Sequence, residues 1–560
     1  MKNRHVWSKV KKMKYTDFLI FLIYIGILTG LQWTNGAFES EFGGHPDEAA
    51  HYITGLMFHD YAAALELTSP LKFAENYYIH YPKVAIGHWP PFFYVIQSVW
   101  MLLFSPSRIS LLLLTAFLTA LLAGTVCLII RKKADAYTAF GAGLMLIILP
   151  LIQQYSSMVM AEILLALLSL WAAICFGLFL DTEKSRWSVG FGVCAVLAIS
   201  TKGNGLALTL LPPLAILFSR KFHILLRMRF WYPVFMVAFI CGPWYWVTLD
   251  MAKNGMAKES LSLSYTLAAI PCFSSHLVKI AGTGLSILIM LGLIQEVILP
   301  CRTVGAEGKS AALGALLAGV WGFHVIVPAS LEIRHLIMAV PSLMIFFAAG
   351  TRAVAKHLPG RQLTHKSKSA LLMLAAMAFF MWNDFTFAEK AWYGFRNIAQ
   401  HLSSVQKFQN QILVISSDEQ GTGMFVSEFA MQEKRPGHVI LRADKVLSTS
   451  RWDGSQYKLF YETSEEIMRY LERIPAGIVI IDDSASRNSQ LPHHQLFRKS
   501  IEKEPQRWKL MGRYSLTRKG ITYPDAVCVY QMKGHENQRV KAIEVDMSEA
   551  LGRNFEKYFQ

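Results

Sequence analysis

The sequence predicts a polytopic α-helical membrane protein with a soluble α/β domain at its C-terminal end. Of its 560 residues, 53% are hydrophobic and only 17% are charged, whereas soluble proteins carry about 25% charged residues. The hydrophobic residues gather into repeated blocks of about the length that crosses a bilayer. Short clusters of basic residues separate many of these blocks. Together these features predict a protein that passes through the membrane many times.

The lengths of the apolar blocks predict about 11 membrane spans. They cover residues 16–33, 108–130, 136–152, 160–180, 188–200, 204–219, 231–249, 277–299, 310–328, 335–350 and 369–386. The apolar block 91–104 is too short for a span, and prolines bound it on both sides. We therefore expect a re-entrant or interfacial helix there.

Charge then predicts the topology. The formal net charge is +16, and the basic residues cluster at Lys2–Lys14, Arg131–Lys133, Arg220–Arg229 and Arg352–Lys368. If 91–104 does not span, all four clusters fall on the side of the N-terminus, as the positive-inside rule requires of cytoplasmic loops. This distribution favours a lipid bilayer as the partner and gives no support to nucleic acid. The first apolar block lacks a cleavage site and is expected to stay as a span.

An odd number of spans places the tail outside the cytoplasm. We predict a transmembrane catalytic domain over 1–386, with an outer loop and interfacial helices at 34–107, and an extracytoplasmic α/β domain over 387–560. The apolar runs 411–416 and 477–481 predict buried strands, and both are followed by aspartates. The spacing Thr463-x-x-Glu466 predicts a capping box that opens a helix. Segments 507–516 and 526–532 predict further strands.

The outer loop is acidic and holds the first candidate site. In Gly43-Gly44-His45-Pro46-Asp47-Glu48, a proline suits the first turn of a helix and acids are favoured by the helix dipole. Asp47 is then ionised at neutral pH, as a general base must be. The alternative is that both acids only cap the helix. Seven acidic residues stand against two lysines between positions 34 and 90.

Two cations follow later in the same loop. Lys83 and His88 flank a glycine and precede Pro90-Pro91. Such an irregular backbone at the membrane surface is expected only where protein buries it or a wet cavity adjoins it. Either the two cations face a phosphate, or they extend to the membrane interface as anchors.

Three later segments bring further charges to the same predicted side. Glu162 begins an apolar span, where a carboxylate is unfavourable unless it faces a cavity. Lys202 lies in the connection Ser200–Gly205, and Arg334-His335 precedes another span. Arginine can bind phosphate oxygens through two hydrogen bonds. The alternatives are a capping acid at Glu162 and plain interface anchors at the cations.

The order of these motifs resembles the GT-C class of integral membrane glycosyltransferases, in the branch of protein O-mannosyltransferases and lipid A aminoarabinose transferases. The resemblance covers roughly residues 16–350. It rests on Asp47-Glu48, Pro90-Pro91-Phe92, Met160-Ala161-Glu162, Thr201-Lys202-Gly203, Gly242-Pro243-Trp244-Tyr245 and Arg334-His335. The resemblance implies inverting transfer of a sugar from a polyprenyl-phosphate donor to an acceptor hydroxyl on the extracytoplasmic face.

The resemblance also implies residue roles. Asp47 is expected to activate the acceptor, with Glu48 and Glu162 as supporting acids. The expected ligands of the donor phosphate are Lys83, His88, Lys202, Arg334 and His335. Two departures weaken this transfer of roles, because Trp89 stands where the family commonly has His or Lys, and Glu162 replaces the usual Asp.

No cofactor or metal is expected. His45, Asp47, His51 and His59 could supply ligands, but they have no strict metal spacing, and close relatives do not generally require a metal. The seven cysteines show no paired spacing; Cys272 and Cys528 both fall outside in this topology, which leaves a disulfide open.

Other functions remain open. A polyprenyl-linked glycan ligase or polymerase would be expected to carry its catalytic loop late in the chain. A transporter of polyprenyl-linked sugars would be expected to show internal repeats and charges within its spans. A receptor rests on the C-terminal domain alone. The acceptor is a protein, lipid or glycan, and the expected location is the bacterial inner membrane with the N-terminus in the cytoplasm.

Overall fold

The computed structural model describes residues 15–65, 69–249, 261–359, 364–405, 408, 411–451, 454–484, 490–534, 542–545 and 555–558. Their contacts form two units. The first runs to Thr34 and includes Leu113–Ser157 and Ala161–Ala388; the second holds Asn35–Leu112, Met158–Met160 and the chain from Glu389. The basic cluster Lys2–Lys14 lies outside the described residues. The predicted domains 1–386 and 387–560 stay a prediction, because contacts do not test independent folding.

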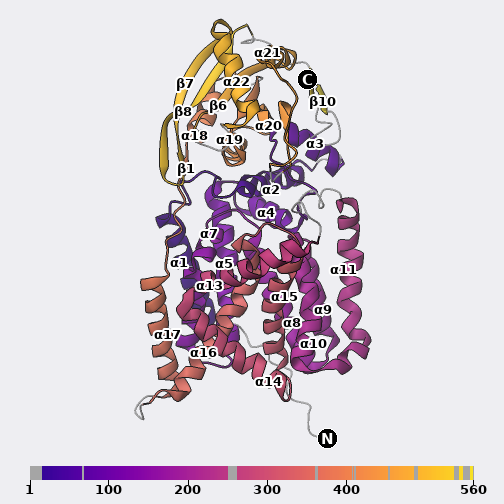
Figure 1. Cartoon of the computed structure of the whole chain (residues 1–560), viewed down its shortest axis with the longest axis vertical. Helices are drawn as coiled ribbons and strands as arrows, with labels where there is room; N and C mark the ends of the chain where they lie inside the picture. The colour runs from indigo at the N-terminus through magenta and orange to yellow at the C-terminus, as the bar shows by residue number, and fades with distance from the viewer. Residues whose placement is uncertain are drawn as a thin grey trace. The chain divides into compact units, whose positions relative to one another are not determined.

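The first unit is helical. Its elements are α1 (Tyr15–Thr34), most of α5 (Arg108–Ile130), α6 (Ala136–Ile148), α7 (Pro150–Ser156), α8 (Glu162–Thr182), α9 (Ser185–Ile199), η1 (Gly203–Leu210), α10 (Leu211–Ser219), η2 (Phe222–Leu226), α11 (Met228–Val247), α13 (Leu263–Leu293), the π-helix η3 (Ile294–Ile298), α14 (Leu299–Arg302), α15 (Gly308–Ile326), η4 (Ile333–Ala339), α16 (Val340–His357) and α17 (His365–Asn383). Figure 1 shows α8, α9, α10 and α15 running beside one another.

Burial separates central from peripheral helices in this unit. The most apolar windows of α8 and of η4 with α16 are 78% and 83% buried, whereas those of α1 and α11 are 17% and 11% buried. Helices that are apolar on all sides require either protein or lipid around them. The central helices therefore find protein neighbours, and the apolar surfaces of α1 and α11 are suited to lipid.

Glycines set the close approach of α13 to α16. A Cβ atom on Gly292 would lie 2.0 Å from the carbonyl oxygen of Phe346, and one on Gly350 would lie 1.8 Å from that of Leu288. Only glycine permits such contact between helix backbones, as is common in membrane helix pairs.

Among the residues that the structure describes, seven helices are long and apolar enough to cross a membrane, or eight if the bent pair α6 and α7 forms one span. Helices α9, α4 (Phe92–Leu103) and η1 with α10 are apolar but shorter. These helices make the protein membrane-embedded, and the count of about 11 stays a prediction. The short helix expected at 91–104 is found as α4, with 12 residues.

The second unit combines the outer loop with the C-terminal part of the chain. Its helices before the sheet are α2 (Pro46–Ala64), α3 (Pro70–His80) and α4; its later elements are β1 (Trp392–Tyr393), α18 (Phe395–Ser404), β2 (Ile412–Ser416), α19 (Glu419–Gln432), β3 (Val439–Arg442), α20 (Ala443–Val446), β4 (Ser448–Thr449), β5 (Lys458–Leu459), α21 (Ser464–Arg473), β6 (Ala476–Asp482), α22 (Pro492–Lys503), η7 (Pro505–Arg507), β7 (Trp508–Arg518), β8 (Ile521–Met532), β9 (Ala542–Val545) and β10 (Phe555–Tyr558). The predicted α/β fold of the C-terminal part is thus confirmed.

A six-stranded sheet forms the centre of this later part, in the order β1-β7-β8-β6-β2-β3. Strands β3, β2 and β6 are parallel, and β8 pairs antiparallel with β6. The long β7–β8 hairpin is drawn in yellow in Figure 1. Every residue of β2 and β6 is buried, which explains their continuous apolar runs. The predicted capping box at Thr463 and Glu466 is formed at the start of α21.

Ion pairs join the outer loop to the C-terminal elements within this unit. Asp60 on α2 accepts hydrogen bonds of 2.6 and 3.0 Å from Arg435. Arg108 pairs with buried Glu428 on α19. Tyr81 donates a 2.7 Å hydrogen bond to Glu433. Because removing one partner of a buried ion pair is strongly destabilising, these pairs fix the outer loop against α19 and its neighbours.

Candidate active site

Asp47 and Glu48 are adjacent in the first turn of α2, but their side chains have different environments. His45 caps the helix, and its Nδ1 accepts a 3.1 Å hydrogen bond from the Asp47 amide. Pro46 occupies the first helical turn, where its missing N–H has no consequence. The Asp47 side chain is 24% exposed and lies 3.5 Å from His45 Nδ1. Asp47 thus keeps access to solvent at a helix terminus that favours its charge.

Glu48 has a different environment. Its side chain is fully buried, and Lys390 donates a 2.5 Å hydrogen bond to its Oε1. The amides of Gly44 and Val159 donate further bonds of 3.0 and 3.3 Å. A carboxylate with this many donors is a structural anchor, so Glu48 holds the turn that presents Asp47.

Lys83 is a buried cation in the same unit. The residue is 7% exposed, and its ammonium forms no hydrogen bond or ion pair with the residues that the structure describes. Burial, followed by the nearby Arg442 charge, lowers the Lys83 pKa to about 8, while Glu419, Asp444 and Asp47 oppose that shift. Buried charges are normally paired. The cation is therefore free to bind an anionic ligand.

Arg442 and Asp444 complete the surroundings of Lys83 and were not predicted. Arg442 donates hydrogen bonds of 3.1 and 2.6 Å to Asp444. Burial alone would lower the pKa of Arg442 and raise that of Asp444, but their mutual attraction outweighs it: the pKa of Arg442 is raised and that of Asp444 is held well below its usual range. The available signal was the run Arg442-Ala443-Asp444 at the carboxyl end of a parallel strand, where ligands commonly bind.

His88 contacts the neighbouring ring of Trp89. It is exposed, and its ring lies edge-on to Trp89 at 4.6 Å between centroids. Trp89 in turn lies 4.4 Å from the ring of buried His51. Trp89 therefore packs against α2 and shapes the connection before Pro90.

The aspartates after β2 and β6 form a separate polar cluster. Arg518 donates bonds of 2.7 Å to Asp418 and 2.5 Å to Asp482. Ser417 and Ser484 complete this network with their hydroxyls. Since both carboxylates pair with the same arginine, the cluster joins the sheet to the start of α19.

The first unit brings the other predicted residues together. Lys202 donates a 2.6 Å hydrogen bond to Glu162, and Arg334 lies 3.8 Å from the same oxygen. Both cations are largely buried, at 8% and 11% side-chain exposure. Arg334 also pairs with Glu332 at 2.8 Å. We call Glu162, Lys202, Glu332, Arg334 and His335 the Glu162 group.

His335 is held from both ring nitrogens. Asn204 lies 2.8 Å from its Nδ1, and Ser330 lies 2.9 Å from its Nε2. The ring stacks on His324 at 4.9 Å between centroids. These contacts orient His335 beside Arg334, so the predicted pair forms part of a fixed polar network.

The predicted site residues therefore fall into two groups. Asp47, Glu48, Lys83 and His88 belong to the second unit, and Glu162, Lys202, Arg334 and His335 belong to the first. Among the described residues, no set of three or more His, Cys, Asp or Glu is arranged to hold a metal, and metal dependence stays a prediction. All seven cysteines are free thiols, including Cys272 and Cys528.

The chain has the fold of GT-C integral membrane glycosyltransferases, as the order of the motifs had suggested. No family model and no curated protein matches the sequence. At the low identities given below, the similarity to solved structures establishes the fold alone.

Three solved structures illustrate this similarity. ArnT from Cupriavidus metallidurans bound to undecaprenyl phosphate aligns over 93% of this chain and 99% of its own, with 12% identity and a TM-score of 0.55. The oligosaccharyltransferase AglB from Archaeoglobus fulgidus, with an inhibitory peptide and dolichol-phosphate, aligns over 91% and 74%, with 12% identity and a TM-score of 0.52. Arabinofuranosyltransferase AftD from Mycobacteria aligns over 91% and 41%, with 14% identity and a TM-score of 0.50.

Proposed function

We propose that this protein is an inverting glycosyltransferase that moves a sugar from a polyprenyl-phosphate donor to an acceptor hydroxyl. The observation that carries the proposal is the buried, unpaired ammonium of Lys83 in the electrostatic field of Asp47. A base and a phosphate-binding cation are the two groups that such a transfer requires. Support also comes from the fold, which ArnT shares in a structure with undecaprenyl phosphate and AglB shares in one with dolichol-phosphate.

In the proposed reaction, Asp47 accepts the proton of the acceptor hydroxyl. The acceptor oxygen attacks the anomeric carbon from the face opposite the phosphate, and a new C–O bond forms with inverted configuration. The bond between the anomeric carbon and the phosphate oxygen breaks, and the phosphate leaves with the electron pair. A base placed in this way contributes about 10²–10⁴-fold to the rate.

Lys83 is proposed to stabilise the leaving phosphate. Its ammonium has three N–H donors, and none of them takes part in an ion pair with a residue that the structure describes. With a pKa of about 8 it is mostly protonated at pH 7, and a nearby phosphate would favour the charged form further. Fixed donors directed at developing negative charge contribute about 10²–10³-fold each.

The Glu162 group is proposed as a second set of phosphate ligands. Lys202 uses one donor on Glu162 and keeps others for a phosphate oxygen. Arg334 has a planar guanidinium that suits phosphate geometry. Glu162 and Glu332 offset the two cations, so the group has little net charge before a phosphate binds. Glu48 is proposed to act through Lys390 as a positioning residue for Asp47. His88 is proposed as a further ligand of the donor phosphate.

The test is transfer by the purified protein from a panel of polyprenyl-phosphate sugars, with Asp47→Asn and Lys83→Met. Glu39→Gln and Lys72→Met are matched controls, because these side chains are exposed in the same outer segment. We expect both site variants to lose at least about 100-fold in kcat/KM and both controls to keep activity. Full transfer by folded Asp47→Asn would remove the proposed base.

The same experiment tests the class of the acceptor, because a peptide, a lipid and a glycan are each offered to the same preparation. Sugar identity and prenyl length follow from the donor that is used. A bacterial inner membrane with an extracytoplasmic site is the proposed setting, and it has its own test in the Discussion.

A further inference from the structure

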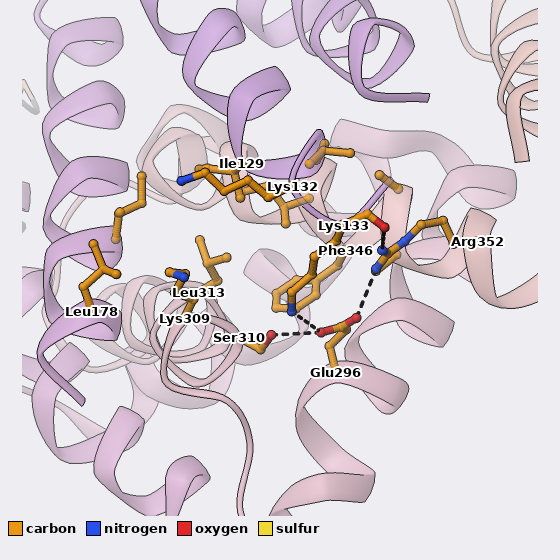
Figure 2. Close-up of a pocket in the computed structure, with 15 residues that line it drawn as sticks. Ile129, Lys132, Lys133, Leu178, Glu296, Lys309, Ser310, Leu313, Phe346 and Arg352 are labelled. Carbon is orange, nitrogen blue, oxygen red and sulfur yellow. Dashed lines mark hydrogen bonds and ion pairs between the residues drawn. The ribbon is translucent and has the colours of Figure 1, made fainter. Parts of the chain in front are cut away.

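A pocket lies in the first unit, away from the Glu162 group. It is bounded by the last turn of α5, the later half of α8, the first turns of α15 and part of α16 (Figure 2). Glu162 is the first residue of α8, and Leu178 of the pocket follows 16 positions later. At 1.5 Å per residue this is about 24 Å along the helix axis. The pocket therefore belongs to the opposite end of the helices from the Glu162 group.

Aliphatic and aromatic side chains form most of the pocket wall. They include Ile129, Ile174, Leu178, Leu313 and Phe346. A lining of this kind has no polar groups to satisfy a soluble anion along most of its surface, whereas an acyl chain packs against it favourably. The wall chemistry therefore fits the chain of a lipid.

The charged groups lie in two parts of the pocket. Figure 2 shows Glu296 joined to Lys133, Ser310 and Arg352. Glu296 belongs to the π-helix η3, and π-helical turns are frequent at functional sites. This first part is satisfied internally, because Lys133 also pairs with Glu307 at 2.5 Å.

The second part consists of Lys132 and Lys309. Within the residues that the structure describes, neither ammonium forms a hydrogen bond or an ion pair. Figure 2 shows both nitrogen ends on the side of the pocket where Leu178 and Leu313 lie. Two unpaired cations beside an apolar wall match a molecule with an anionic head and an apolar tail.

We propose that this pocket binds a glycerophospholipid with an anionic headgroup. The lipid phosphate lies between Lys132 and Lys309, and one acyl chain lies against Leu178, Leu313 and Phe346. The site lies away from the Glu162 group and does not depend on the proposed transfer reaction. The pocket lies at the end of the helices that carries basic clusters. The positive-inside rule predicts that this end lies in the cytoplasmic leaflet.

Charge selectivity is the first test. Purified protein in neutral detergent is titrated with phosphatidylglycerol, phosphatidylcholine and soluble glycerol 3-phosphate, and bound lipid is measured by native mass spectrometry. A basic residue near an anionic lipid contributes about fivefold to binding. We expect phosphatidylglycerol to bind about 25-fold more tightly than phosphatidylcholine, and glycerol 3-phosphate not to compete. Equal binding of the two lipids, or competition by glycerol 3-phosphate, overturns the proposal.

Variants locate the site. The double variant Lys132→Gln/Lys309→Gln is expected to bring phosphatidylglycerol within about twofold of phosphatidylcholine. Its control is Lys356→Gln/Lys366→Gln, which removes two exposed lysines from α16 and α17 and should leave the preference unchanged. Ala349→Phe fills the pocket without changing charge, and it is expected to reduce binding of both lipids.

Retention of the phosphatidylglycerol preference in the double variant overturns the proposal, as does its loss in the control. Displacement of phosphatidylglycerol by a polyprenyl phosphate in the wild type but not in Ala349→Phe would assign the pocket to the carrier lipid instead. Because both lysines are at least partly exposed, the double variant is expected to fold, and Ala349→Phe provides an independent readout.

Discussion

Lys390 donates a 2.5 Å hydrogen bond to Glu48, the residue that directly follows the proposed base Asp47. Both partners are buried, with side-chain exposures of 5% and 0%. The two residues are 342 positions apart in the chain. The short segment that presents Asp47 is thus held by a residue from the beginning of the C-terminal part.

This pair predicts a marked asymmetry between single and double variants. Glu48→Gln or Lys390→Met leaves one buried charge alone, which typically costs about 3–5 kcal/mol. The double variant Glu48→Gln/Lys390→Met removes both charges and should recover a large part of that loss. Thermal unfolding of the four proteins measures the coupling. Additive losses would show that the two side chains do not stabilise each other.

Lys83 predicts opposite effects on stability and activity. Its folded pKa of about 8 lies below the ordinary lysine value of 10.5, so folding releases a proton between these pH values and stability rises with pH there. Below pH 8 both states are protonated and the full burial penalty applies. Lys83→Met should therefore stabilise the protein at pH 7, by about 1–3 kcal/mol, while transfer is lost. A destabilised Lys83→Met protein would contradict this assignment; Lys72→Met is its control.

Glu162 predicts a change in product binding. Glu162→Gln removes the carboxylate that pairs with Lys202 and lies 3.8 Å from Arg334. If these cations contact the donor phosphate, the released polyprenyl phosphate should bind about tenfold more tightly and inhibit transfer more strongly, because an added unit of positive charge favours the anion. Product inhibition constants for wild type and Glu162→Gln measure this effect. Equal constants would place the Glu162 group outside the phosphate site.

Glu41 predicts a pH-dependent stability that is unrelated to the reaction. Burial, followed by the charge of Glu428, raises its pKa to about 7, although the amides of Arg396, Gly394 and Phe395 oppose the shift. An acid with a raised folded pKa binds its proton more tightly in the native state, so stability falls as pH rises from about 4.5 to 7. Glu41→Gln should flatten this slope in thermal unfolding between pH 5 and 7. An unchanged slope would assign it to other groups.

Membrane orientation has a direct test. In a cysteine-free background, Lys72→Cys and Lys509→Cys on exposed positions of the second unit should react with an impermeant maleimide in intact cells. Lys356→Cys should react only after permeabilisation, because the basic clusters predict a cytoplasmic location there. Labelling of Lys356→Cys in intact cells would reverse the proposed topology.

The sequence predicted what depends on local pattern. Continuous apolar runs identified the buried strands β2 and β6, and Thr463 with Glu466 identified the start of α21, because caps and periodicity are written over a few neighbouring residues. The short helix at 91–104 followed from its length and flanking prolines. The order of weak motifs was also sufficient to suggest the fold class.

Long-range pairing was not accessible in the same way. Glu48 carried the same local signal as Asp47, and only its contact with Lys390 separates an anchor from a candidate base. Arg442 and Asp444 were missed because their importance arises from their placement beside Lys83. The spacing of residues along a chain does not predict such contacts when the partners are hundreds of residues apart.

The ion pairs that tie α2 and Arg108 to the later elements limit how this chain can be divided. Ending the polypeptide before Lys390 would strand Glu48, and removal of α19 with the residues after it would strand Asp60 and Arg108. Chimaeras with a protein of the same fold should therefore exchange residues 35–112 and 389–534 together. Any shortened version for crystallisation or engineering must keep both of these segments.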